Sequence, residues 1–580
     1  MRPPLKNFPL NTLFSLGFIA LAAILPYLYT LDAPFVYDDL HTIVNNPPLR
    51  YHSSTYDFFR MPELFSGTKA EMYRPINQIS YMLNFRLGGS GPEGFRLFNL
   101  LIHLLCAWLV FWLSRLIPGL EKASLLAALL FALHPVQTET VIYLSSRSTL
   151  LASFFILLGL IAFIHATEAE RSPLSAWLIG LLASLCLIAG LASKAIAVTL
   201  PALALAYLVL FPTGRKSRGL VIVSLLFMIS GLYVLLRHAL GLYTFFPPEL
   251  VRPLSTNLLT QTRVTFHYLR ILLMPIHLSL ENDMAEIQSP FHPWFLLSIL
   301  GWLAILCLGL ARARRYPVIL FSILFFIIAL IPTSTLIPLV VIASENRLYL
   351  ASLGLIWPVS MLFLLLLENQ RARAGGIVFI LFILACFFCL TLSRGAVWGA
   401  SERLWRDAVT KAPLQARAHV NYGIELKKQG HLRAAVREYQ MALRLDPRNT
   451  WAYNNLGNIY FDQGQYDAAR KAYERAVEIA PGNINACLNL GHLLVAMGDP
   501  EGAAALLEKA VSIAPFRADT RHDLGIVYLR YLGDWNKACE QLERSLELDP
   551  GQKDAEKIRR AIGELRMPSS IQGEQDQRAR

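Results

Sequence analysis

The chain has 580 residues, of which 54% are hydrophobic and only 16% are charged, and its formal net charge is +12. Charged residues make up about a quarter of an ordinary globular protein, so the composition excludes a wholly soluble chain. The basic residues lie mostly in short loops between apolar runs, which indicates membrane topology and no nucleic-acid partner.

Apolar runs dominate the chain up to residue 397. Many are about 20 residues long, which is enough to cross a hydrocarbon core of roughly 30 Å. We interpret the first run as a retained helix, because no small-residue cleavage site follows it. The pattern predicts a membrane domain over 1–397 with about eleven spans. The spans are expected at 10–31, 96–115, 123–136, 147–166, 174–192, 195–212, 219–238, 294–311, 316–336, 349–367 and 375–396.

Residues 257–277 form a further helical segment that could be counted as a crossing. Arg263, His267 and Arg270 follow one another at helical spacing, so one face of this helix is basic. An interfacial or re-entrant helix fits that pattern better than a span. Eleven crossings from a cytoplasmic N-terminus keep the basic loops inside. They place the long first loop, 32–95, and the C-terminal part of the chain on the outer side.

The polar C-terminal part contains an internal repeat. Prolines recur every 34 residues at 413, 447, 481 and 515, and glycines keep the same period at 423, 457, 491 and 525. A 34-residue period with Leu-Gly, a later aromatic residue and a final Pro is typical of the tetratricopeptide repeat, a pair of packed helices. Arrays of this kind expose a concave surface that binds peptides or proteins, although this one could instead be a packing scaffold for the membrane domain.

The sequence therefore predicts an all-α protein. A polytopic membrane helical bundle is expected to precede a C-terminal tetratricopeptide-repeat solenoid. The expected boundaries are a linker helix at 398–412, four repeats at 413–552, and a helix end with a disordered tail at 553–580.

Ionisable side chains beside membrane spans are candidates for function, because unpaired charges in lipid are costly. By the span count, five groups of them fall on the outer side. These groups are Asp38, Asp39 and His41; Arg74; His134, Glu139 and Arg147; Lys194; and Glu345 with Arg347.

Carboxylates together with a surplus of cations at one membrane face suit an anionic lipid head group. Arg and Lys neutralise a phosphate, and a carboxylate can take the proton of an attacking hydroxyl. A sugar carried on polyprenyl phosphate has this form. Each group could instead be an ion pair that holds the helices together, although the adjacent pair Asp38–Asp39 is less suited to that structural role.

Several segments in order along the chain resemble one known family. They are FVYDDLHTIVNNP, YRPINQISYMLNFRLGG, FALHPVQTETVIYLSSRSTLL, RVTFHYLRILLMPIHLSLEN and SENRLYL, followed by the repeats. The chain resembles the transmembrane and tetratricopeptide-repeat containing proteins, a group of protein O-mannosyltransferases in the GT-C class of membrane glycosyltransferases. The sequence departs from the family's pattern at SSRST, at Ala195 after Lys194, and at Asn346.

The resemblance implies a GT-C-like fold and a transfer reaction that inverts the sugar. The donor would be mannose or another hexose on polyprenyl phosphate, and the acceptor a protein hydroxyl presented by the repeats. Asp38 would be the general base or acceptor-orienting carboxylate, with Asp39 beside it. From their charge and expected side of the membrane, we expect donor-phosphate or substrate binding by the remaining candidates, His41, Arg74, His134, Glu139, Arg147, Lys194, Glu345 and Arg347.

We expect no cofactor, although two adjacent aspartates could hold a divalent metal if further oxygen ligands were present. The lack of long loops and of a disulfide set favours a bacterial inner membrane, with the repeats in the periplasm. Two alternatives remain open. One is a non-enzymatic, membrane-anchored assembly factor whose repeats bind envelope proteins. The other is a GT-C enzyme that glycosylates an envelope glycan or lipid.

Overall fold

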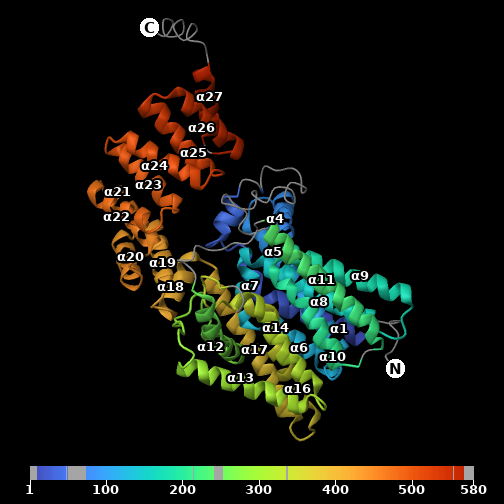
Figure 1. The fold of residues 1–580 in the computed structure, drawn as a ribbon. Helices are drawn as coiled ribbons and strands as arrows, with labels where there is room; N and C mark the ends of the chain where they lie inside the picture. The colour runs from blue at the N-terminus through green and yellow to red at the C-terminus, as the bar shows by residue number, and fades with distance from the viewer. Residues whose placement is uncertain are drawn as a thin grey trace. The chain divides into compact units, whose positions relative to one another are not determined.

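The computed structural model describes residues 10–46, 49, 74–212, 214–240, 252–334, 338–552 and 554–566, and within these ranges it contains helices and turns but no strand. The chain divides into two compact units. Residues 1–45 and 72–412 belong to the first unit, and the second includes the chain from Pro413 onward (Figure 1). The predicted all-α class, with apolar helices before a repeat array, is confirmed.

Eight helices in the described part of the first unit are long and apolar enough to cross a membrane. They are α1 with its turn η1 (Leu10–Ile24, Leu25–Thr30), α5 (Pro92–Leu116), α8 with the preceding η6 (Leu144–Ser146, Arg147–Ala166), α9 (Pro173–Ser193), α11 (Lys216–Ala239), α13 (Pro293–Arg312), α14 (Pro317–Ser334) and α17 (Arg373–Trp398).

Two further predicted spans are broken helices. The first joins η4 and α6 to η5 and α7, and it bends by 50° where Pro135 follows His134. Proline lacks the N–H that would continue the helix, which explains this break. The second joins η9 and α15 to α16 and bends by 55°. Their bounds are Glu121–Ala123, Ser124–Leu133, Pro135–Gln137 and Thr138–Ile142, then Glu345–Arg347, Leu348–Ala351 and Leu353–Glu368.

The remaining predicted span, 195–212, is a short apolar helix. It consists of η7 (Ala195–Thr199) and α10 (Leu200–Leu210). Its length is about 26 Å, slightly less than a typical hydrocarbon core. By length and composition the described residues thus hold eight spans, or ten if each bent pair is counted, where the sequence predicted about eleven.

Four short elements complete the described part of this unit. They are η2 (Leu40–Val44), α4 (Pro75–Gly88), α12 (Leu254–Leu273) and α18 (Ser401–Lys411). Helix α12 contains residues 257–273 of the segment 257–277, and it is not among the helices apolar enough to cross a membrane. It buries Val264, Tyr268 and Ile271, while Arg263 and Arg270 lie toward its opposite side.

Helix α8 lies at the centre of the membrane unit. In the most apolar stretch of η6–α8, 72% of the residues are buried, whereas the corresponding share in α13 is 11%. Close packing on α8 depends on Gly159, where an added Cβ would come within 2.7 Å of Leu200 and 3.2 Å of Cys186. The start of α8, with residues 145–149, is therefore held by neighbours on several sides. This position matters for the site described below.

The second unit is an array of helix pairs (Figure 1). Its helices are α19 (Ala416–Lys428), α20 (Leu432–Leu445), α21 (Thr450–Asp462), α22 (Tyr466–Ile479), α23 (Ile484–Ala496), α24 (Pro500–Ile513), α25 (Ala518–Val527) with η10 (Tyr528–Leu532), α26 (Trp535–Leu548) and α27 (Ala555–Arg566).

The periodic residues of the sequence occupy the contacts that hold each pair. Gly457 in α21 faces the ring of Tyr473 in α22, and an added Cβ would come within 2.5 Å of that ring. The turn between these helices contains Gly464 with φ of 72°, a conformation that glycine adopts at little cost. At the start of α21, the side chain of Asn449 accepts a hydrogen bond from the Ala452 N–H.

Parts of the predicted organisation fall outside the described residues. Most of the first outer loop (47–73, apart from Leu49) and the C-terminal tail from residue 567 are among them. The predicted domain boundaries at 397, 412 and 552 stay predictions.

Candidate active site

The acidic pair lies on a tight turn between η1 and η2. Tyr37, directly before it, has φ of 50°, and among the described residues it is the only non-glycine with positive φ. A bulky residue in this conformation is strained by an amount of order 1–3 kcal/mol, and such strain is concentrated at functional sites. The Tyr37 ring packs against Trp405 with centroids 5.2 Å apart, which holds the turn in place.

Asp39 is completely buried, and its carboxylate is held by three hydrogen bonds. The N–H and hydroxyl of Ser145 donate to Oδ1 at 2.8 and 2.7 Å, and the Val36 N–H donates to Oδ2 at 3.3 Å. Burial opposes ionisation more strongly than these donors favour it, so the pKa of Asp39 rises to about 6. Asp39 therefore fixes the turn to the segment that precedes α8.

Asp38 is only partly buried. Its backbone carbonyl accepts hydrogen bonds from the N–H and hydroxyl of Thr42 at 2.9 and 2.7 Å. The Thr42 hydroxyl also lies 2.9 Å from the Ser145 hydroxyl. Tyr143 lies beside both carboxylates of the pair. Of the two aspartates, Asp38 thus has the side chain that an incoming molecule could reach.

A second cluster contains three of the predicted cations. Lys194 donates from Nζ to the Thr149 hydroxyl at 2.6 Å, and Arg74 donates from Nη1 to the Ser148 hydroxyl at 3.1 Å. Burial, followed by the charges of Arg74 and Arg347, lowers the pKa of Lys194 to about 7. Burial also lowers the pKa of Arg74. The Glu139 carboxylate acts on Lys194 in the opposite direction, so three cations and one carboxylate influence one another here, and such perturbed groups are typical of functional sites.

A single five-residue run joins the acidic pair to these cations. Along it, Ser145 binds Asp39, Ser148 binds Arg74 and Thr149 binds Lys194. The run covers the end of η6 and the first turn of α8, so its two ends are about 6–8 Å apart along the helix axis. Asp39 and Lys194 therefore bind side chains that are about one helical turn apart on the same run.

Arg147 lies in the middle of the same run but is held by the protein itself. Its guanidinium donates to Asn99 Oδ1 at 2.7 Å, Asn84 Oδ1 at 2.6 Å and the Phe95 carbonyl at 2.8 Å. It also lies over the Tyr81 ring, 4.5 Å from its centroid. With no exposed surface, Arg147 anchors the start of α8 to α4 and α5.

Three further predicted site residues, Arg347, His134 and His41, bind neither Asp39 nor the hydroxyls of residues 145–149. Arg347 is 5% exposed and donates to the carbonyls of Val341 and Ile342 at 2.7 and 3.0 Å. His134 is 2% exposed, and its Nε2 lies 2.9 Å from the Leu272 carbonyl. His41 is exposed on η2. Only Arg347 among these three contributes charge to the cation cluster.

Glu139 and Glu345 belong to a buried ionic network that includes a residue missed in the sequence. Arg394 in α17 lies 3.6 Å from a Glu345 oxygen and 2.8 Å from an Asp407 oxygen, and Lys411 contacts Asp407 at 2.7 Å. The Ser344 hydroxyl donates to Glu139 Oε1 at 3.1 Å. Arg394 was detectable as a charged residue at the end of an apolar span.

The hydroxyls of Ser145, Ser148 and Thr149 were also missed as site residues. Serine and threonine are common, and only the fold shows that this run lies between the two charged clusters. Among the residues that the structure describes, no group of three or more His, Cys, Asp or Glu could hold a metal ion. A divalent metal at the acidic pair stays an untested prediction.

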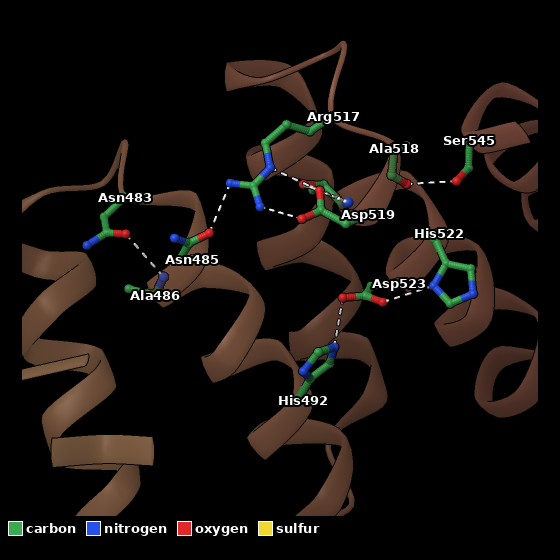
Figure 2. A network of polar contacts seen from close by, with 11 residues as sticks. Asn483, Asn485, Ala486, His492, Arg517, Ala518, Asp519, His522, Asp523 and Ser545 are labelled. Atoms are coloured by element: carbon green, nitrogen blue, oxygen red, sulfur yellow. Dashed lines mark hydrogen bonds and ion pairs between the residues drawn. The ribbon is translucent and has the colours of Figure 1, made fainter. Parts of the chain in front are cut away.

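The repeat array contains a separate polar surface. A cavity of about 290 Å³ is lined by residues of α19, α21, α22 and α23, including Asn458, Asn489 and His492. Figure 2 shows the adjoining network, in which Asp523 lies between His492 and His522. Burial opposes ionisation of Asp523, but hydrogen bonds from both histidines outweigh it and lower its pKa to about 2.

Two family models match the C-terminal part of the chain. The model described as "Tetratricopeptide repeat" covers residues 449–515, and the one described as "TPR repeat" covers residues 423–464. A solved structure, that of YrrB, a TPR protein with an unusual peptide-binding site, is 25% identical over 28% of this chain and 88% of its own, with a TM-score of 0.24.

Curated relatives match most of the chain, including the membrane unit. Human protein O-mannosyl-transferase TMTC1 is 27% identical over 488 residues, which is 74% of this chain and 55% of the relative. Protein O-mannosyl-transferase F38B6.6 of Caenorhabditis elegans is 25% identical, covering 73% and 62%. Mouse protein O-mannosyl-transferase TMTC4 is 28% identical, covering 73% and 65%. The chain thus spans about 55–65% of the length of these relatives.

Proposed function

We propose that this chain, a homologue of the TMTC protein O-mannosyl-transferases, is an integral membrane glycosyltransferase that moves a hexose from a polyprenyl phosphate donor to a protein hydroxyl. Mannose is the sugar we favour, because the relatives are named for it. The proposed site contains the acidic pair Asp38–Asp39 and the cation cluster of Arg74, Lys194 and Arg347.

The observation that carries this proposal is the continuity of the two clusters through residues 145–149. A general base and an anion-binding group must lie on opposite sides of the reacting carbon, with the sugar ring between them. In this proposal the hexose ring lies between the groups bound at the two ends of the run, Ser145 and Thr149, which are about 6–8 Å apart along the helix axis. An ion-pair network would place Arg74 and Lys194 directly against the acidic pair, whereas here both bind serine and threonine hydroxyls, and the carboxylate whose charge acts on Lys194 is that of Glu139.

In the proposed reaction, Asp38 accepts the proton of the attacking serine or threonine hydroxyl. The hydroxyl oxygen forms a bond to the anomeric carbon, while the bond from that carbon to the phosphate oxygen breaks. The electron pair of the broken bond leaves with polyprenyl phosphate, whose extra negative charge is stabilised by Lys194, Arg74 and Arg347. A single displacement of this kind inverts the anomeric centre. Asp39 orients the turn through its hydrogen bonds to Ser145.

The repeat array is proposed to bind the acceptor protein. The cavity at Asn458, Asn489 and His492 offers amide and imidazole groups that can hydrogen-bond an extended backbone. It also contains Lys427, which is paired with Asp462 at 2.9 Å, so its charge is balanced. Such a surface suits neutral, hydroxyl-rich segments better than strongly charged ones.

We propose that both the site and the repeats lie on the extracytoplasmic side, in the bacterial periplasm. The asymmetry of the basic loops supports this orientation, because Lys and Arg concentrate on the cytoplasmic side of membrane proteins. Arg215 lies between α10 and α11, at whose start Lys216 stands, and Arg314 and Arg315 follow α13.

The test is transfer of radiolabel from membrane-embedded polyprenyl phosphate mannose to envelope proteins by the full-length chain. We expect transfer by wild type and a loss of at least about 10²-fold in Asp38→Asn, the usual size of a general-base contribution. Ser15→Ala, on the exposed face of α1, is the matched surface control and should transfer normally. Equal transfer by Asp38→Asn and wild type would mean that the acidic pair has a structural role and is not catalytic. Label found only in glycans or lipids would replace the proposed acceptor.

A further inference from the structure

A cavity of about 940 Å³ lies within the membrane unit, and none of its lining residues belongs to the acidic pair or the cation cluster. Its walls are the basic side of α12, the segment that follows it, the first turns of α13 and the end of α18. The volume is in the range of sites that hold small organic ligands or lipid head groups.

One wall of this cavity is cationic. Arg263 and Arg270 are seven residues apart on α12, so both lie on the same helix face, with His267 between them. The Arg270 Nη2 lies 3.3 Å from His267 Nδ1. Burial and the two arginines lower the pKa of His267 to about 4, so the imidazole is neutral at physiological pH. Among the described residues, no carboxylate forms an ion pair with either guanidinium.

The cavity lies where a membrane span begins. Trp294 and Leu297, in the first turns of α13, line it and are 51% and 61% exposed. Only 11% of α13's most apolar stretch is buried, so its outer surface is available to lipid. The Arg263 guanidinium lies over Trp294, 5.1 Å from the ring centroid. Tryptophan at the end of a span marks the head-group level of the bilayer.

The segment that follows α12 contributes acceptor groups to the cavity. Glu281, Asn282 and Asp283 follow one another there, and Glu281 is only 4% exposed. Lys411 also lines the cavity, but its Nζ is held by Asp407 at 2.7 Å and by the Leu278 carbonyl at 2.8 Å. Two arginines and two carboxylates that line one cavity suit a ligand with an anion at one end and hydroxyls at the other. A simple anion would be repelled by Glu281 and Asp283.

We propose that this cavity binds the hydroxylated head group of a phosphate-bearing lipid. The phosphate lies between Arg263 and Arg270, which donate charge-assisted hydrogen bonds. The head-group hydroxyls donate to the carboxylates of Glu281 and Asp283, and the chains lie along the exposed side of α13. The binding site is separate from the proposed catalytic site, so the inference does not depend on the transferase activity.

The experiment measures lipid binding to the full-length protein in phosphatidylcholine nanodiscs. Two labelled probes are titrated in turn, phosphatidylglycerol and polyprenyl phosphate mannose, and inorganic phosphate is added as a soluble competitor. Arg263→Gln/Arg270→Gln removes both guanidinium groups of the cavity. The matched control, Arg312→Gln/Arg314→Gln, removes two exposed charges at the other end of α13. Arg263→Lys/Arg270→Lys retains the charge and guards against misfolding.

We expect the glutamine double variant to bind the probe at least about tenfold more weakly, because two charge-assisted hydrogen bonds are lost. The control should bind like wild type, and the lysine variant should be intermediate. Saturable binding of phosphatidylglycerol would identify bulk lipid as the source of the head group. Binding of polyprenyl phosphate mannose alone would identify a lipid-linked sugar. Equal binding by the glutamine variant and the control, or full displacement by inorganic phosphate, would overturn the proposal.

Discussion

At the scale of single residues, Lys194 is the cation whose protonation state is most sensitive to its surroundings. Its pKa of about 7 means that the ammonium is present below this pH and is lost above it. A bound phosphate needs that charge. Arginine in the same place would stay protonated over the whole accessible range.

We therefore predict that the KM for the lipid donor rises as the pH increases above 7 in wild type. In Lys194→Arg the KM should stay flat over the same range, and in Lys194→Gln it should be high at every pH. Steady-state kinetics between pH 6 and 9 measure this difference. An unchanged alkaline rise in Lys194→Arg would show that another group titrates.

The Ser145 hydroxyl lowers the pKa of Asp39, whereas burial raises it. This hydroxyl stabilises the carboxylate form, so removing it should raise the pKa of Asp39 above about 6. A carboxyl with a raised pKa is protonated below that value and ionised above it. Activity that needs the ionised form is therefore lost as the pH falls through the pKa.

We predict that Ser145→Ala moves the acid limb of the kcat/KM profile to higher pH. Ser146→Ala is the matched control, because the Ser146 hydroxyl contacts Asn346 and not Asp39. Its acid limb should coincide with that of wild type. If both alanine variants shift the limb equally, Asp39 is not the group that titrates.

The sequence was enough to identify charged residues as site candidates, but it did not show which side chains they would contact. Asp39, Arg74 and Lys194 were identified because charge beside a membrane span is costly and needs a reason. The contacts of Arg147 with Asn84 and Asn99 were not predictable. They depend on how α4, α5 and α8 pack, which no local pattern encodes.

At the scale of elements, the same glycine position packs against different side chains in successive repeats. Gly457 and Gly491 occupy the same place in successive repeats. An added Cβ at Gly457 would come within 2.5 Å of the Tyr473 ring, whereas at Gly491 the closest atoms, of Leu507, are 3.3 Å away. A tyrosine ring held in the core is less adaptable than a leucine side chain.

Gly457→Ala should therefore destabilise its helix pair by about 1–3 kcal/mol, the usual cost of overpacking. Gly491→Ala should cost clearly less, because the alternative rotamers of Leu507 can relieve the contact. Hydrogen–deuterium exchange of α21–α22 and α23–α24 in the full-length chain measures both changes. Equal protection losses in the two variants would contradict this account of the packing.

The helical elements were largely predictable, but the sequence signals only one of the two breaks. A proline after His134 could have predicted the bend of the third span. The second bend lies at Ser352, whose hydroxyl donates to the Tyr349 carbonyl at 3.0 Å and accepts from Gln137 at 3.2 Å. Such local competition with the helix depends on a partner from elsewhere in the chain, so the apolar run alone does not show it.

At the scale of the whole molecule, the orientation of the chain depends on the short segment η7–α10. If it crosses the membrane, the basic residues at 214–219 are on the opposite side from Lys194. Because η7–α10 is about 26 Å long, a slightly thinned bilayer would accommodate it at modest cost.

We predict that a topology reporter inserted after residue 214 is cytoplasmic and that one fused after residue 552 is extracytoplasmic. Alkaline phosphatase and green fluorescent protein fusions report the two sides with opposite signals. A reporter at both positions that gives the same signal would mean that the number of crossings between them is even. If both reporters were cytoplasmic, the membrane would separate the repeats from an extracytoplasmic acidic pair, and the proposed acceptor route would fail.

In the proposed reaction, the acidic pair and the cation cluster have different roles, one as base and one as phosphate-binding group. These roles are tested by measuring the steady-state transfer of mannose from polyprenyl phosphate mannose by the Asp38→Asn and Lys194→Gln variants. Donor binding to each variant is measured separately. We predict that Asp38→Asn lowers kcat at least about 10²-fold with donor affinity retained, because it removes a base. Lys194→Gln should chiefly weaken donor binding. Loss of donor binding in Asp38→Asn, or normal turnover in both variants, would contradict the account.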